Sequence, residues 1–257
     1  MARLVTEVER CTGPAPRVGV GIPGSPSPGT GLIRNANSVW LNGRPLRADL
    51  EQALDRPVRL ANDANCLALS EATDGAGAGA GTVFAVVIGT GCGGGLVVNG
   101  RLLQGANGIA GEWGHTPLPW PEPSELGGAA CWCGRTGCME MFVSGTGFER
   151  DYARDGPAAS GPEIIAAMRA GESRATAAFD RYVSRLGRGL AIICDLLDPE
   201  VIVLGGGMSN VGELYKPLPE VIARHVFSDT WEGRIAPALH GDSSGVRGAA
   251  WLWPEDG

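Results

Sequence analysis

The sequence has no block of basic residues and no long apolar run. Its formal net charge is −7, from 21 Lys and Arg against 28 Asp and Glu, and this balance indicates neither a nucleic-acid partner nor an anionic membrane surface. The longest apolar runs, such as residues 83–88, are far too short to cross a bilayer. Residues 1–11 contain no apolar signal core. We therefore expect a cytoplasmic protein with no membrane partner.

Aromatic residues are also few, at 6%, whereas glycine is abundant, at 41 of 257 residues. The chain is long enough for one large domain or two small ones. The glycines gather in residues 75–81, 89–95 and 205–207. The last two groups follow apolar segments, which indicates that the backbone there turns tightly or approaches a ligand. Residues 75–81 are typical of a hinge between two lobes.

The spacing of apolar residues predicts strands that alternate with helices. We expect strands at residues 17–23, 57–60, 82–88, 96–99 and 201–204, and a short strand or a turn at residues 236–240. We expect helices at residues 1–11, 46–54, 142–152, 162–170, 175–197, 214–224 and 245–253, with one more that starts near residue 61 and ends near residue 72. This alternation predicts the α/β class with largely buried sheets.

Residues 110–140 concentrate residues that bind metals. The four candidates, His115, Cys131, Cys133 and Cys138, are separated by 15, 1 and 4 residues. Three thiolates and one imidazole form a closed tetrahedral set, which is typical of structural zinc sites. The alternative is three unligated thiols that pack as small apolar groups. Their close spacing, with glycines at the turns, favours zinc, and the lack of a secretory signal disfavours a disulfide.

Asp63 is the candidate general base, because it follows a predicted strand and begins a predicted helix. Ligands of open α/β sheets usually bind at this place, and an aspartate there could accept the proton of a substrate hydroxyl. Its neighbour Asn62 adds an uncharged hydrogen-bonding group. The alternative is that Asp63 caps the helix. The local sequence leaves these two interpretations equal.

Charged residues beside the cysteines could hold a polar substrate. Glu112, His115 and Glu140 offer two carboxylates and an imidazole to sugar hydroxyls. The alternatives are solvation at the surface and, for His115, metal binding alone. Their clustering around the metal-binding segment favours a pocket.

Two glycine turns could contact a nucleotide. Backbone N–H groups of the first could bind phosphate, although a tight hairpin explains it as well. The second could let a flat ring lie against the backbone, and its alternative is close helix–strand packing. The residues concerned are Thr90, Gly91, Gly93 and Gly94 in the first turn and Gly205, Gly206 and Gly207 in the second.

Taken together, these segments resemble the sugar-kinase branch of the ROK family. The matching segments are VGVGIPGSPSPGTGLIRNANSVWLNG, RPVRLANDANCLALSEA, TVFAVVIGTGCGGGLVVNGR, GIAGEWGH, CWCGRTGCME, PEVIVLGGGMSN and HGDSSGVRGAAWLW. The resemblance implies a two-lobed α/β fold of the actin–hexokinase, ribonuclease H-like type. Residues 1–78 and a closing helix at 244–257 would form the small lobe. Residues 79–243 would form the large lobe, with a zinc-binding loop at 115–138.

The resemblance also implies an ATP-dependent sugar kinase and a role for each site residue. Asp63 would take the proton from the sugar 6-hydroxyl that attacks the γ-phosphate of ATP, with Mg²⁺ supporting the transfer. The sugar would be held by Asn62, Glu112, His115 and Glu140, with Asn37 a weaker candidate. The turn at residues 90–94 would contact the ATP phosphates, and residues 205–207 the adenosine. The zinc would be structural, and the protein a homodimer.

Several alternatives remain open within this resemblance. The segments NANSVWLNG and GEWGHTPLPW are most similar to those of bacterial fructokinases, with N-acetylglucosamine kinases and glucokinases as alternatives. A sugar-binding protein without catalysis is a second function, and a transcriptional repressor a third. The negative charge, the lack of an N-terminal helix-turn-helix segment and the presence of Asp63 disfavour the repressor.

One motif of the family, the opening D-x-G-G-T-K turn, is not found in this sequence. That turn supplies a phosphate-binding loop. We therefore expect an incomplete small lobe, truncated at its N-terminus, in which residues 18–22 present an unpaired strand edge. We also expect weak or absent kinase activity from the chain as written.

Overall fold

The computed structural model describes residues 1–253, apart from the side chain of Asp242. Its helices are α1 (Ala2–Thr12), α2 (Leu46–Leu54), α3 (Asp63–Asp74), α4 (Glu140–Val143), α5 (Gly145–Ala153), α6 (Gly161–Arg169), α7 (Ser173–Leu197), α8 (Leu218–Ala223) and α9 (Ser244–Ala250). Its strands are β1 (Val18–Ile22), β2 (Ser25–Pro26), β3 (Ile33–Arg34), β4 (Val58–Asn62), β5 (Thr82–Ile88), β6 (Cys92–Val98), β7 (Arg101–Leu102), β8 (Val201–Gly205) and β9 (Arg234–Pro237).

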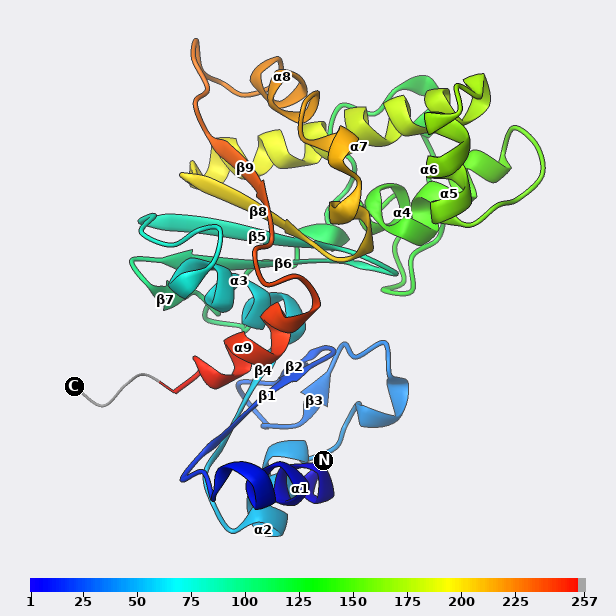
Figure 1. Cartoon of the computed structure of the whole chain (residues 1–257). Helices are drawn as coiled ribbons and strands as arrows, with labels where there is room; N and C mark the ends of the chain where they lie inside the picture. The colour runs from blue at the N-terminus through cyan, green and yellow to red at the C-terminus, as the bar shows by residue number, and fades with distance from the viewer. Residues whose placement is uncertain (254–257) are drawn as a thin grey trace.

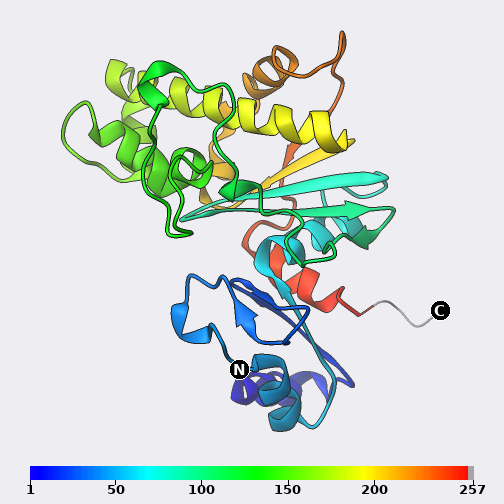
Figure 2. The ribbon, with the colours of Figure 1, turned by 180° about the vertical axis from the view of Figure 1, so that it is seen from behind.

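The elements gather at two ends of the molecule, with α3 and α9 between them (Figures 1 and 2). The α1 and α2 helices and the β1–β4 strands lie at one end. A five-stranded sheet, with α4–α8 beyond it, lies at the other. No helix within residues 1–253 is long and apolar enough to span a bilayer.

The N-terminal end is built on a parallel pair of strands. Strand β1 pairs with β4, with Val18 opposite Val58 and Ile22 opposite Asn62. Apolar side chains of β1, α2 and β4, such as Leu50, form a core under this pair. Within the described residues β1 pairs with β4 alone, so its other edge is unpaired.

The large sheet has the order β7-β6-β5-β8-β9 and is mixed. Strand β5 runs antiparallel to β6 and parallel to β8, and β8 runs parallel to β9. Side chains of β5 alternate between two cores: Phe84 and Val86 join the core that contains α7, whereas Val83 and Ala85 face Leu67 of α3. This period of two is the pattern of a strand buried on both faces.

The structure corrects one predicted turn. Strand β6 begins at Cys92, so Gly93 and Gly94 are paired strand residues, opposite Val87 and Val86, and not part of the turn. A Cβ at Gly94 would collide with Trp113. The glycine run therefore serves close packing on both faces of a strand as well as the turn at residues 89–91.

Other predicted boundaries were wrong for identifiable reasons. The helix predicted at 142–152 is split into α4 and α5, because Ser144 leaves the helical conformation and its hydroxyl accepts a hydrogen bond from Gly147 N at 3.0 Å. The helix predicted at 214–224 begins only at Leu218, after Pro217. A proline disfavours the helical conformation in the residue before it, here Lys216. Strand β9 lies about two residues before the predicted 236–240.

The predicted closing helix begins at Ser244 and ends at Ala250, earlier than residue 253. Residues 254–257 of the predicted segment lie outside the described residues. The α9 helix packs against α3 and β1, and α3 itself covers one face of the large sheet. The lobe boundaries at 78 and 243 stay a prediction.

Candidate active site

A pocket of about 630 Å³ opens where β4 passes into α3 and β5 turns into β6. It brings together residues that the sequence predicted to act on a sugar or on phosphate. These are Asn37, Asn62, Asp63, Thr90, Gly91, Gly93, Gly94, Glu112, His115 and Glu140. Gly205, Gly206 and Gly207 do not line it.

Asp63 and Asn62 have distinct positions at the start of α3. Asn62 is the N-cap: its Oδ1 accepts a hydrogen bond from Ala64 N at 2.9 Å, and its Nδ2 donates one to Gly24 O at 3.2 Å. Asp63 is the first helical residue, and its Oδ1 also accepts from Ala64 N, at 2.8 Å. Asn62 thus has the cap geometry, whereas the Asp63 side chain is open to the pocket.

The pocket walls shift the acidity of Asp63. Although its side chain is accessible from the cleft, the protein atoms around it reduce its solvation, and this burial raises the pKa of Asp63. Hydrogen bonds from the Ala64 backbone and the Asn62 side chain oppose the rise. A carboxylate with a raised pKa is a better proton acceptor than an ordinary surface aspartate.

Glu112 adds a second carboxylate close to Asp63. Burial raises the pKa of Glu112; the charges of His115 and Arg34 lower it, and those of Asp63 and Glu140 raise it further. The charges of two other carboxylates and one imidazole of the pocket therefore act on Glu112. Such a set can accept hydrogen bonds from several hydroxyl groups.

The turn between β5 and β6 is fixed from outside. Gly145 N donates to Gly89 O at 2.7 Å, and Thr146 Oγ1 donates to Thr90 O at 2.9 Å. A Cβ at Gly91 would press on a carboxylate oxygen of Glu140. The turn is thus held by the start of α5 on one side and by Glu140 on the other.

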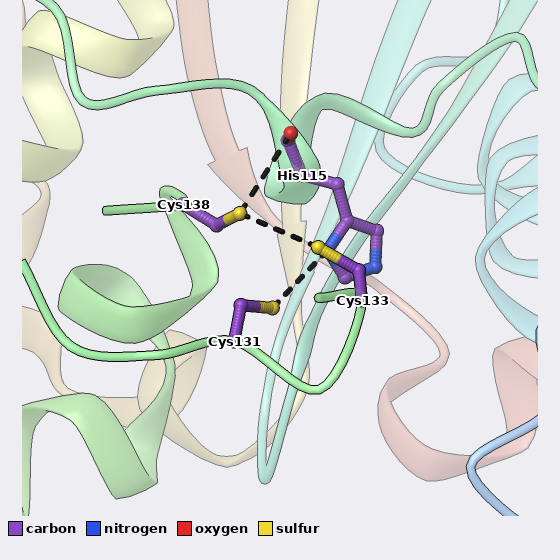
Figure 3. Close-up of side chains that lie close together, drawn as sticks. All are labelled: His115, Cys131, Cys133 and Cys138. Atoms are coloured by element: carbon purple, nitrogen blue, oxygen red, sulfur yellow. Dashed lines mark hydrogen bonds between the residues drawn. The ribbon is translucent and has the colours of Figure 1, made fainter. Parts of the chain in front are cut away.

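The four predicted metal ligands lie together beside this pocket (Figure 3). Their ligand atoms all lie within 4.8 Å of one another. His115 Nδ1 is 3.6 Å from Cys131 Sγ, and Cys133 Sγ is 3.6 Å from Cys138 Sγ. Zinc bonds of about 2.0–2.3 Å place neighbouring ligand atoms of a tetrahedron roughly 3.3–3.8 Å apart. The donor set and its spacing therefore fit a zinc ion.

Local backbone bonds shape the cysteine loop. Cys131 N donates to Arg135 O at 2.7 Å, and Gly134 N donates to Cys131 O at 3.0 Å. Gly134 has a φ of 87° and Gly137 one of 71°, a region that favours glycine. The glycines between the cysteines thus let the loop fold back so that the thiols converge.

A buried ion-pair network, which the sequence did not reveal, supports the segment that leads into this loop. Arg185 Nε and Arg188 Nη2 of α7 contact the Glu125 carboxylate at 2.6 and 2.8 Å. Arg188 Nη1 also donates to Trp120 O at 2.6 Å. Loss of one partner would leave an uncompensated buried charge, so this network fixes the loop on the long helix.

Among the other residues that line the pocket, Asn35, Trp132 and Thr146 have side chains with an N–H or O–H group, and the sequence analysis missed them. Asn35 has a φ of 56°, which asparagine tolerates better than most residues. Trp132 could have been found from the sequence, because it is an aromatic residue between two predicted metal ligands, Cys131 and Cys133. No sequence signal singled out Thr146.

The second glycine group lies at the carboxyl end of β8, outside the pocket. A Cβ at Gly205 would overlap the Leu67 side chain, and one at Gly206 would lie 2.8 Å from Ile88 O. A Cβ at Gly207 would meet nothing within 4 Å. The first two glycines thus serve packing, and Gly207 alone has open space beside it.

The family follows from a comparison with known proteins. A family model described as "ROK family" matches residues 1–256. The chain belongs to the ROK family. The N-acetyl-D-glucosamine kinase of Pectobacterium atrosepticum is 42% identical over 254 residues, which cover 97% of this chain and 84% of that protein.

Solved structures show the same fold. The ROK hexokinase from Thermus thermophilus matches with a TM-score of 0.85 and 36% identity, covering 100% of this chain and 86% of that one. A ROK family glucokinase from Streptomyces griseus, in complex with glucose and AMPPNP, matches with a TM-score of 0.81 and 29% identity, covering 99% and 88%. The predicted α/β, hexokinase-like fold class is confirmed.

Proposed function

We propose that this ROK protein transfers the γ-phosphoryl group of ATP to the 6-hydroxyl of a hexose, with Asp63 as the general base. The family and its named relatives make the chain an ATP-dependent hexose kinase, a phosphotransferase. The observation that carries the proposal is the position of Asp63. It lies at the carboxyl end of β4, in a pocket shared with Glu112, His115 and Glu140.

In this mechanism the side chains of the pocket orient the sugar and Asp63 moves one proton. Hydrogen bonds to the other sugar hydroxyls come from five side chains of the pocket. The carboxylates accept and the amide and imidazole groups can also donate. These side chains are Asn37, Asn62, Glu112, His115 and Glu140. The 6-hydroxyl is thereby directed at Asp63, which accepts its proton as the bond from the hydroxyl oxygen to the γ-phosphorus forms. The bond from that phosphorus to the bridging oxygen breaks, and ADP leaves. Phosphoryl transfer needs little covalent help from the protein, so this positioning supplies most of the catalysis.

The nucleotide is proposed to lie on the two turns at the carboxyl ends of β5 and β8. Because Gly93 and Gly94 are strand residues, we assign the phosphate contact chiefly to Thr90 and Gly91. The open side of Gly207 is the candidate place for adenosine. Gly205 and Gly206 allow this turn to pack closely.

Two metals belong to the proposal, Mg²⁺ with ATP and zinc in the cysteine loop. Mg²⁺ would neutralise charge on the ATP phosphates. Zinc would be held by His115 and the three cysteines. Four protein ligands leave no open position, so its role would be to stabilise the loop.

N-acetylglucosamine is the first substrate we propose, because the relatives at 42% identity carry that name. Fructose, the prediction from sequence resemblance, is the second, since no comparison names a fructokinase among the relatives described above. Glucose is the sugar of the Streptomyces griseus complex. The cytoplasmic location and the homodimer also stay predictions.

A coupled ADP-release assay tests the function. The chain receives ATP and Mg²⁺ with N-acetylglucosamine, fructose, glucose or mannose, and Asp63→Asn serves as the control. We expect sugar-dependent ADP release that the variant lacks, with the highest kcat/KM for N-acetylglucosamine. The rate should be low, because the sequence has no D-x-G-G-T-K turn to bind phosphate. Sugar binding by calorimetry without any ADP release would instead assign a non-catalytic sugar-binding protein. Light scattering of the same sample tests the dimer.

A further inference from the structure

Trp132 connects the metal-binding cluster to the pocket. It lies between Cys131 and Cys133, is 55% exposed and lines the pocket wall. Its ring packs edge-on against the imidazole of His115, with centroids 4.9 Å apart and planes at 86°. Its indole Nε1–H donates a hydrogen bond to Glu140 Oε1 at 2.7 Å. The residue thus contacts two of the groups proposed to hold the sugar.

These contacts decide how the Glu140 carboxylate is oriented. Its Oε1 is held by the Trp132 indole, and its Oε2 accepts a hydrogen bond from Cys92 N at 3.0 Å. One donor comes from the cysteine loop and the other from the start of β6. Two donors from separate segments fix the plane of the carboxylate, while its remaining lone pairs stay available for a substrate hydroxyl.

We propose that Trp132 is a substrate-positioning residue, whose indole N–H orients the Glu140 carboxylate toward the sugar. Because Trp132 lies between two cysteines of the metal-binding loop, the orientation of Glu140 then depends on the position of that loop. The inference rests on the proposed function. Without the indole N–H, the carboxylate keeps the Cys92 amide on Oε2 and, on Oε1, a long contact of 3.9 Å from Cys131 Sγ. A thiol at this distance is a weak donor, so the carboxylate can rotate about the amide bond that remains. Sugar binding is then weakened, whereas the turn at residues 89–91 keeps its other tethers at Gly89 and Thr90.

The test compares Trp132→Phe with Trp120→Phe. Phenylalanine at 132 keeps an aromatic ring but removes the N–H donor. Trp120 is a matched control on the same long loop: it is 49% exposed, and its ring packs against His225, 5.3 Å away, outside the pocket. Each protein is assayed for KM with N-acetylglucosamine, KM with ATP, bound zinc and sugar-induced change in tryptophan fluorescence.

We expect Trp132→Phe to raise the sugar KM by roughly 10- to 150-fold, the range for a lost hydrogen bond to a charged acceptor. The KM for ATP and the zinc content should stay within about twofold of wild type, and the sugar-induced fluorescence change should disappear. Trp120→Phe should keep all four properties. A sugar KM for Trp132→Phe within twofold of wild type overturns the proposal, and so does a parallel loss of zinc, which indicates a structural role.

Failure of the proposed function would be visible separately. If wild-type protein binds N-acetylglucosamine but releases no ADP, the dissociation constant from calorimetry replaces KM, and Trp132→Phe must still weaken binding. If wild-type protein neither binds nor phosphorylates any sugar of the panel, the proposed function and this inference both fall.

Discussion

The hydroxyl of Ser244 donates a hydrogen bond of 2.8 Å to the buried carboxylate of Glu71, 173 residues away in the sequence. The same carboxylate accepts backbone N–H bonds from Ala76 at 2.8 Å, Leu239 at 2.9 Å and His240 at 3.1 Å. One side chain near the end of α3 thus joins the glycine-rich segment that follows α3 to the segment that leads into α9. Both segments connect the large sheet to the two helices, α3 and α9, that lie between the ends of the molecule (Figure 1).

We predict that Glu71→Gln lowers the free energy of unfolding by about 2–4 kcal/mol. The –NH₂ group of glutamine is a donor and would face N–H groups that are donors too, so at least one buried N–H group loses its acceptor. The negative charge that strengthens the other hydrogen bonds is also lost. Urea unfolding followed by circular dichroism measures the change.

Asp74→Asn is the matched control for this variant. Asp74 lies one turn further along α3 and pairs with His240 and Arg247, but its side chain is 38% exposed. Exposed pairs contribute about 0–1 kcal/mol, so this variant should lose no more than that. Equal losses in Glu71→Gln and Asp74→Asn would contradict the role we give to Glu71.

The same carboxylate predicts a loss of stability in acid. Burial alone would raise the pKa of Glu71, but four hydrogen bonds to the charged form outweigh it and hold the pKa below its usual value. The stabilisation is therefore present above the unfolded pKa of about 4.3 and is lost as the pH falls through the folded pKa. The stability difference between wild type and Glu71→Gln should shrink between about pH 6 and pH 3.

Asp63→Asn should reduce kcat by roughly 10²–10⁴-fold, the usual contribution of a general base. Wild-type kcat/KM should rise with pH through the raised pKa of Asp63, above about 3.9. Because a carboxylate with a raised pKa costs stability once it ionises, the variant should be at least as stable as wild type at neutral pH.

Stability and sugar binding are the controls for that variant. In Asp63→Asn, the new amide oxygen can still accept the hydrogen bond that Ala64 N donates to the aspartate, so the fold should be unchanged. A variant that unfolds more easily, or that keeps full kcat with a flat pH profile, would show that Asp63 acts as a helix-terminal residue and not as the base.

We predict that each chain binds one zinc ion at the cluster of His115 and three cysteines. Removal of the zinc should lower the melting temperature of the protein. Structural zinc contributes directly to folding because its ligands are not preorganised in the unfolded chain. Cys133→Ser should lose the zinc, whereas Cys11→Ser, at an exposed cysteine of α1, should keep it. Elemental analysis of both variants decides between zinc and three unligated thiols; wild type without zinc after purification in its presence would exclude the metal.

Local patterns were enough to predict several elements and part of the pocket lining. The α2 helix and β5 strand match their predicted bounds, because the apolar residues Leu46, Leu50 and Leu54 repeat at helical spacing and residues 82–88 are a continuous β-branched and apolar run. Asp63 was found because it follows the carboxyl end of β4, and Glu140 because it lies two residues after the last cysteine of the cluster.

What the sequence did not show depends on contacts between distant segments. Gly93 and Gly94 read as a turn because nothing local shows that Trp113 and α3 press on β6. In the sequence, Glu71 resembles an ordinary glutamate of a helix. Only the fold shows that residues 239–244 supply hydrogen-bond donors to it. Arg185 and Arg188 likewise resemble surface residues of α7, and only the fold brings Glu125 to them.

Gly248→Ala should destabilise the protein by more than about 2 kcal/mol, because α9 crosses α3 without room for a side chain. A Cβ at Gly248 would overlap the carbonyl oxygen of Cys66, a backbone atom that cannot move alone. Overpacking of this kind typically costs about 1–3 kcal/mol, and more where backbone must shift.

Gly245→Ala, in the same helix, would meet nothing within 4 Å. It should be neutral or stabilise the helix by up to about 1 kcal/mol. Urea unfolding of both variants separates loss of helix docking from an effect of alanine on the helix itself, and equal stability of the two would contradict the close crossing of α9 and α3.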